Sequence, residues 1–143
     1  MKDRCLFKAK ICNGEWVAGF LHCKENKWYI SNKAGAPFAF EVRPDTICQC
    51  TGLKDKNGKL IWEGDIILFQ RDNDDCPFQD KDTKKRLGKV FYKDFRTTFA
   101  IEMGKSGSGS LNDDLWKYVQ NGNRVEVIGN IFDNPELSES EEI

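Results

Sequence analysis

The segment from Cys50 to Ile67 constrains the fold more than any other part of the chain. It contains an Asn57-Gly58 pair, then a Glu63-Gly64-Asp65 corner that leads into an apolar run. Asn-Gly is a strong signal for a β-hairpin, because a two-residue turn requires positive φ at both of its positions. The segment therefore predicts a hairpin that feeds, through a tight corner, into a strand.

Period-2 alternation predicts further strands. Residues 4–12 alternate between two sets, Cys5, Phe7, Ala9 and Ile11 on one face and Arg4, Lys8 and Lys10 on the other. Alternation of this kind is typical of a half-buried strand. Turn residues such as those at Asn13-Gly14 separate similar runs. The remaining strands are predicted at 16–23, 28–30, 38–42, 47–51, 65–69, 88–92, 95–103 and 125–132, with the one at 65–69 buried on both faces.

The segments between the strands are polar. Residues 71–87 predict a long exposed loop, and the Gly/Ser-rich residues 104–110 predict a flexible connection. Asn112-Asp113-Asp114 resembles a helix start, because acidic residues are favoured at the positive end of the helix dipole. One short helix of about two turns is therefore expected after it.

Together these signals predict a mostly β fold. Residues 1–45 form an N-terminal β-meander, and residues 46–137 form an SH3-type barrel that includes the one short helix. Residues 138–143 form an acidic tail that is expected to be disordered.

Two segments resemble the YopX family of phage and prophage proteins. These are the hairpin and corner described above and the closing segment Glu126-Val127-Ile128-Gly129-Asn130-Ile131-Phe132-Asp133-Asn134-Pro135-Glu136-Leu137. The resemblance implies an SH3-like barrel with a β-rich N-terminal extension, and it implies phage origin. The residues that carry it as structural motifs are Gly52, Asn57, Gly58, Glu63, Gly64, Asp65, Gly129, Asn130 and Pro135.

Composition limits the classes of partner and compartment. Lys and Arg number 22 against 23 Asp and Glu, so a whole-chain signature of nucleic-acid binding is lacking. No stretch approaches the roughly 20 apolar residues that span a bilayer. The N-terminus does not resemble a secretory signal, so we expect a cytoplasmic protein of the host cell, without membrane contact. In such a reducing compartment most of the six cysteines are expected to be buried as small hydrophobic residues.

Candidate catalytic and metal-binding residues are few. His22, the single histidine, lies on a predicted strand face with Trp16, Ala18 and Phe20, which favours a structural or surface role. Cys48 and Cys50 lack the second pair of ligands that a zinc site requires, and packing is the preferred interpretation. The acidic run at 72–75 lacks the glycine and the glutamate of a calcium loop. We predict no cofactor, no metal and no catalytic residue.

Aromatic and basic side chains are the better candidates for binding. Trp62 and Tyr92, with Trp116 and Tyr118, are expected to be exposed in a groove, because aromatic faces supply large contact areas. Two basic clusters are expected to contribute to an anionic partner. The binding candidates are Trp62, Tyr92, Lys54, Lys56, Lys59, Lys84, Lys85 and Arg86.

Three functions compete. The first is a non-enzymatic accessory protein of a phage or prophage that binds an unknown phage or host protein and forms a homo-oligomer through its edge strands. The second is a nucleic-acid-binding module that uses the barrel face and the lysine clusters. The third, ranked last, is an enzyme whose site uses Glu63, Asp65 and Glu126.

Overall fold

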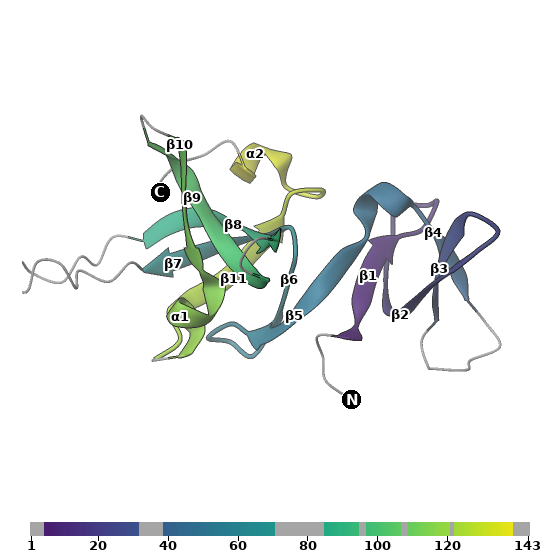
Figure 1. Ribbon diagram of the computed structural model, residues 1–143, viewed down its shortest axis with the longest axis horizontal. Helices are drawn as coiled ribbons and strands as arrows, with labels where there is room; N and C mark the ends of the chain where they lie inside the picture. Colours follow the sequence, from purple (N-terminus) through teal and green to yellow (C-terminus); the bar gives the residue numbers. More distant parts are fainter. Residues whose placement is uncertain are drawn as a thin grey trace, which may run out of the picture. The chain divides into compact units, whose positions relative to one another are not determined.

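The computed structural model describes residues 5–31, 39–70, 85–94, 97–106, 109–120 and 122–138, and the chain divides into two compact units, residues 1–53 and 54–143 (Figure 1). Antiparallel strands make up most of both units, as predicted, with two short α-helices in the described part of the second. The predicted boundary between residues 45 and 46 rests on motifs rather than on compactness and stays a prediction.

The first unit is a curled antiparallel meander. Its strands lie in the order β4-β3-β2-β1-β5, which are the first five strands of a six-stranded sheet that continues to β6 (Leu60–Trp62). They have the bounds β1 Phe7–Lys10, β2 Trp16–Lys24, β3 Lys27–Ser31, β4 Phe40–Val42 and β5 Cys48–Lys54, with a 3-10 helix at Pro44–Thr46 between the last two. Ala9, Ile30 and Val42 form the core of the unit, with Val17 and Leu21 packed against it. The period-2 signal in the sequence placed these strands correctly.

The second unit contains a five-stranded antiparallel sheet in the order β10-β9-β8-β7-β11. Its elements are β6 Leu60–Trp62, β7 Asp65–Gln70, β8 Lys85–Lys93, β9 Thr98–Ser106, β10 Gly109–Asp114, α1 Leu115–Gln120, β11 Val125–Asn130 and α2 Pro135–Ser138. Ile66, Ile67 and Phe69 of β7 are all buried, which confirms the strand predicted to be covered on both faces. Phe69 meets Tyr118 of α1 edge to face, with 5.3 Å between ring centroids.

The short helix expected after Asn112-Asp113-Asp114 is confirmed as α1, whereas the flexible connection predicted at 104–110 was wrong, because its described residues lie in β9 and β10. β10 pairs with β9 in a register that places Ser110 opposite Lys105 and Asp114 opposite Ala100. The acidic residues therefore belong to a strand, and α1 begins only at Leu115. Pairing with a neighbouring strand outweighs the weak strand preference of Asn, Asp, Gly and Ser.

Two further boundaries differ from the prediction. Lys85, Arg86 and Leu87 belong to β8 rather than to a loop, because they pair with residues 68–70 of β7. A second helix, α2, begins at Pro135, where fixed φ suits the first helical position. The acidic run at 72–75 and the tail from residue 139 lie outside the described residues.

Candidate functional site

Asp55 organises the hairpin that the sequence predicts. Its carboxylate accepts hydrogen bonds from the backbone N–H of Asn57 and Lys59 at Oδ1, both at 2.9 Å, and from that of Val127 at Oδ2, at 3.0 Å. The side chain is only 3% exposed. One carboxylate thus closes the turn and ties it to β11, a strand 72 residues further along the chain.

The turn itself differs from the expected two-residue form. Gly58 has a φ of 82°, whereas Asn57 is not among the residues with positive φ. The Gly58 N–H donates to the carbonyl of Asp55, and the Asp55 N–H donates to the carbonyl of Lys59. The connection is therefore a longer turn that closes on a glycine in the left-handed region, a common alternative in hairpins.

The Glu63-Gly64-Asp65 corner joins neighbouring strands through the backbone. Gly64, with a φ of 87°, donates its N–H to the carbonyl of Val90 and accepts from the N–H of Ile131. Asp65 is 2% exposed, and its Oδ2 accepts from the Trp62 N–H at 2.8 Å. The corner has a structural role in the second unit.

The closing segment forms a third such device. Asn130 Oδ1 accepts from the N–H groups of Phe132 and Asp133, and the Asn134 side chain accepts from the Asn130 N–H. An added Cβ at Gly129 would lie 2.4 Å from Asn134 Oδ1. Glycine is thus favoured at 129, because a Cβ there would displace the Asn134 side chain from its hydrogen bond with the Asn130 N–H. Asp55 and Asn134 were missed as motif residues, although Asp and Asn in turns are known to cap nearby backbone groups.

The predicted binding residues are dispersed. Lys54, Lys56 and Lys59 are exposed on the hairpin, where Lys56 Nζ lies 3.2 Å from Glu126 Oε2. Arg86 is half-buried on β8; the side chain of Lys85 and all of Lys84 lie outside the described residues. The second predicted basic cluster, Lys84, Lys85 and Arg86, is therefore represented among the described side chains by Arg86 alone.

The aromatic candidates divide into exposed and buried. Trp62 is half-buried, and Tyr92 is 39% exposed with its ring edge-on to Phe99. Tyr118, expected to be exposed, is 1% exposed and is a core residue. Trp116 on α1 is 55% exposed, the largest value among the described large hydrophobic side chains. Of the four, Trp116 best fits a contact surface.

A network of charged side chains joins α1 to Asp113 at the end of β10. Asp113 Oδ2 accepts from Tyr118 Oη at 2.8 Å and from Lys117 Nζ at 3.1 Å. Burial of Asp113 acts to raise its pKa, but the hydrogen bonds from Tyr118, from the Asp114 N–H and from Lys117 outweigh it, and the pKa lies below its ordinary value. Arg124 lies over the Tyr118 ring, 5.1 Å from its centroid. The network fixes α1 against the end of β10.

The residues considered above as candidates for catalysis or metal binding make contacts that stabilise the fold. Asp65 caps the corner, and Glu126 pairs with Lys56. Cys48 and Cys50 are buried, as the packing interpretation predicts, whereas Cys5, Cys12 and Cys23 are exposed, so the expectation that most cysteines are buried was wrong for the described ones. The described ranges contain no group of three or more His, Cys, Asp or Glu side chains arranged to hold a metal ion.

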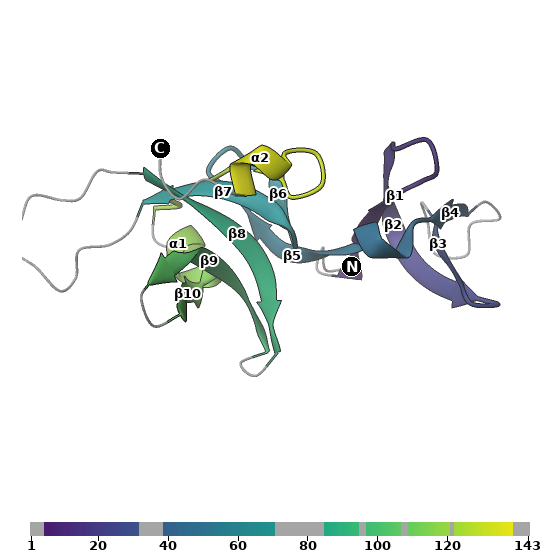
Figure 2. The same ribbon diagram turned by 90° about the horizontal axis from the view of Figure 1, so that it is seen from above.

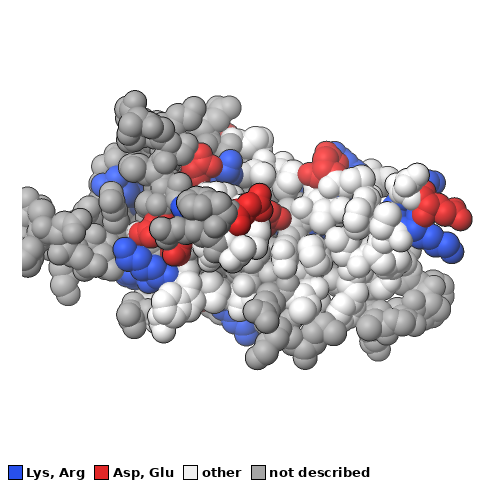
Figure 3. All heavy atoms as spheres, viewed as in Figure 1, with Lys and Arg blue, Asp and Glu red and all other residues white. Residues whose placement is uncertain are grey.

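Surface charge and helix length give two further observations. On the face shown in Figure 3, Lys and Arg side chains of the described residues are interspersed with Asp and Glu and do not merge into one stripe. Within the described part of the chain, no helix has the length and apolar character needed to cross a membrane.

Comparisons with known proteins agree with the fold. The structure is similar to the crystal structure of protein EF1440 from Enterococcus faecalis, with a TM-score of 0.53 and 22% sequence identity, over 94% of this chain and 96% of that chain. At this identity the likeness shows the fold alone. No curated protein matches the chain. Residues 2–139 match the sequence model of a family described as YopX protein. Since that match covers nearly the whole length, the chain belongs to the YopX family.

Proposed function

We propose that the protein is a non-enzymatic interaction module that associates with copies of itself and with a phage or host protein. In this proposal it is an accessory protein of a phage or prophage and acts in the host cytoplasm. The observation that carries it is the exposure of Trp116, at 55%, on the helix that directly follows an edge strand.

The second unit offers two features that suit an interface. β10 pairs with β9 and is the terminal strand of its sheet among the described residues. Edge strands pair readily with another chain. An exposed tryptophan beside such an edge is a typical interface anchor, because its large flat ring loses little conformational entropy on burial.

The proposal includes an SH3-type arrangement for residues 46–137. Strand order supports it: β7, β8, β9 and β10 form a meander, a short helix follows, and β11 returns to pair with β7. Val125 lies opposite Phe69 and Asn130 opposite Asp65 in that last pairing, with one irregularity between Val127 and Gly129. Barrels of this type commonly use surface aromatic residues to bind their partners.

Size-exclusion chromatography with light scattering tests the proposal. The unaltered chain is expected to elute as a defined oligomer, and Trp116→Ser is expected to shift it to the monomer mass. Phe40→Ser is the matched control, because Phe40 is a 42% exposed aromatic residue of the first unit and its loss should leave the mass unchanged. A monomeric unaltered chain at every loading concentration, or a Trp116→Ser variant that stays oligomeric, would refute it.

A further inference from the structure

One face of the first unit carries a row of aromatic side chains. Register places His22 opposite Tyr29 and Trp16 opposite Lys10. Since successive side chains of a strand point to opposite faces, and Val17 and Leu21 pack on the core, the even-numbered residues of β2 point away from it. We name this surface the aromatic face; its rings are those of Trp16, Phe20, His22 and Tyr29.

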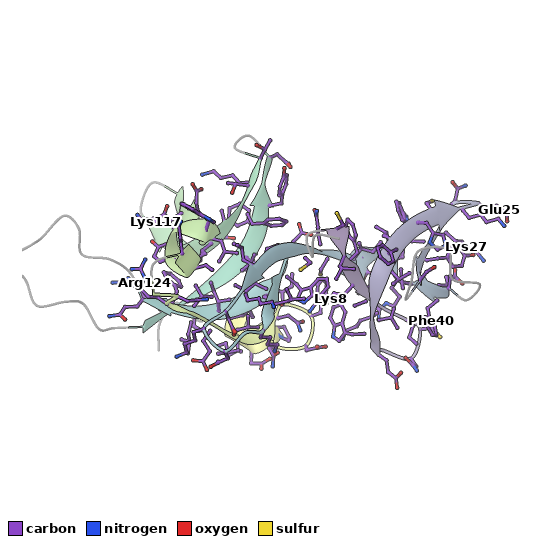
Figure 4. All side chains as sticks on the ribbon, turned by 90° about the horizontal axis from the view of Figure 1, so that it is seen from below. Lys8, Glu25, Lys27, Phe40, Lys117 and Arg124 are labelled. Carbon is purple, nitrogen blue, oxygen red and sulfur yellow. The ribbon has the colours of Figure 1, made fainter. Side chains whose placement is uncertain are left out.

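The same face is basic. β1, β2 and β3 contain four lysines, at positions 8, 10, 24 and 27, and no Asp or Glu. By alternation all four lie on the aromatic face, with Lys8 and Lys27 toward opposite ends of the row (Figure 4). Glu41 on β4 lies 3.8 Å from Lys27 Nζ in an exposed, weak pair, and two further exposed carboxylates, Glu15 and Glu25, lie in the turns at the ends of β2. A chain with a net charge of −1 thus concentrates positive charge on one sheet face.

β2 curves along its length (Figure 2), and the aromatic face follows that curve. Ala18 and His22 are exposed, whereas Trp16, Phe20 and Tyr29 are half-buried. The His22 ring stacks on Tyr29, with 5.6 Å between centroids and 17° between planes. The exposed surface of the aromatic face ends at β5, where Cys48 lies opposite Lys8 and is buried.

Lysine and tryptophan already interact on this face. The Nζ atoms of Lys8 and Lys10 lie 4.7 Å and 5.3 Å from the Trp16 ring centroid. Such cation–π contacts are weak at exposed sites. A flat aromatic ligand with attached negative charge can replace them, because it offers the ring a stacking partner and the ammonium groups an anion.

We propose that the aromatic face binds single-stranded nucleic acid. Unpaired bases stack on the rings of Trp16 and His22, and the backbone phosphates contact the lysines that flank them. Sheet faces that combine aromatic side chains with lysines bind single strands in this way, and stacking tolerates any base because every base has a π-face. The proposal goes beyond self-association, which rests on the second unit, so the two can fail separately.

Fluorescence anisotropy with a dye-labelled oligothymidine of about 15 nucleotides tests the proposal on the full chain. We expect saturable binding, and each of Trp16→Ala and His22→Ala should weaken it about fivefold or more. Because Trp16 is half-buried, Trp16→Ala could weaken binding by disturbing the fold, whereas the exposed His22 can be replaced with little effect on folding. Circular dichroism verifies that both variants are folded. In Lys8→Gln/Lys10→Gln, the slope of log affinity against log salt should fall by about 1.4, the value for two phosphates on a single strand.

Matched controls separate this face from other surfaces. Phe40→Ala removes a 42% exposed aromatic side chain on β4, opposite the core residue Ile30 and so on the other face of the sheet, and Lys56→Gln/Lys59→Gln removes two exposed lysines of the second unit; both should leave the affinity unchanged. The proposal fails if no binding tighter than about 100 µM is seen at low salt. It also fails if duplex DNA or polyglutamate competes as well as the oligothymidine, or if the control variants weaken binding as much as Trp16→Ala does.

Discussion

Replacing Asp55 should destabilise the second unit and release its hairpin from β11. In Asp55→Ala three N–H groups lose a carboxylate acceptor, and hydrogen bonds to charged groups contribute about 1.5–3 kcal/mol each. Two of the donors belong to exposed turn residues that water can reach, whereas Val127 is half-buried. We therefore expect the free energy of unfolding to fall by about 2–4 kcal/mol rather than by the full sum.

Asp55→Asn distinguishes the turn from the connection to β11. The amide oxygen still accepts from Asn57 and Lys59, but its NH2 group faces the Val127 N–H, and the cost should be about 1–3 kcal/mol. Urea unfolding gives the total, and amide hydrogen exchange of Val127 gives the local effect. Asp45→Asn, at an exposed carboxylate of the first unit, should change stability by less than about 0.5 kcal/mol.

The reasoning would be refuted by an Asp55→Ala variant as stable as the unaltered chain. An unchanged exchange rate at Val127 in Asp55→Asn would refute the role of Oδ2 in particular, because that oxygen accepts the hydrogen bond from the Val127 N–H. Faster exchange at Val127 with normal protection in the first unit is the expected pattern.

Three further predictions concern single residues. Gly129→Ala should cost about 1–3 kcal/mol in urea unfolding, and Gly129→Ala/Asn134→Ala should cost less than the sum of the two single changes, because the second removes the clash. Folding lowers the pKa of Asp113, so this carboxylate contributes fully to stability above its unfolded pKa, and the contribution is lost as pH falls through its folded pKa. In thermal melts, Asp113→Asn should therefore lose less stability than the unaltered chain on acidification below about pH 4. Thr97 has a φ of 50°, which strains a β-branched residue, so Thr97→Asn should stabilise the fold by about 0.5–1 kcal/mol in the same melts.

The strands were predictable where one face is buried. Alternation around Ala9, Val17 and Ile30 reflects contact with a core, and that contact is what sets the period. β10 was not predictable, since Ser110 and Asp114 contribute little burial signal and form a strand because β9 lies beside them. Local preference decides least where the backbone pairing supplies most of the stabilisation.

The sites divide in the same way. Gly58 and Gly64 were recognisable because positive φ has a clear signature in sequence. Asp55 was missed because its third partner, Val127, lies 72 residues away, a distance that no local pattern reports. The aromatic face needed the β1–β2 and β2–β3 registers, which place Lys8 and Lys10 beside Trp16, and His22 beside Tyr29.

The long span closed by Asp55 also bears on synthesis at the ribosome. The hairpin around Gly58 emerges early, and two of the three bonds to the carboxylate can form at once. The third cannot form until Val127 has been synthesised, 72 residues later, which at a translation rate of about 5–20 residues per second takes roughly 4–14 s. β7 can pair with β8 on one edge soon after both are made, but its other edge waits for β11. Until β11 emerges, the nascent chain presents an apolar strand with one unpaired edge, so chaperone contact before release should concentrate on residues 65–70.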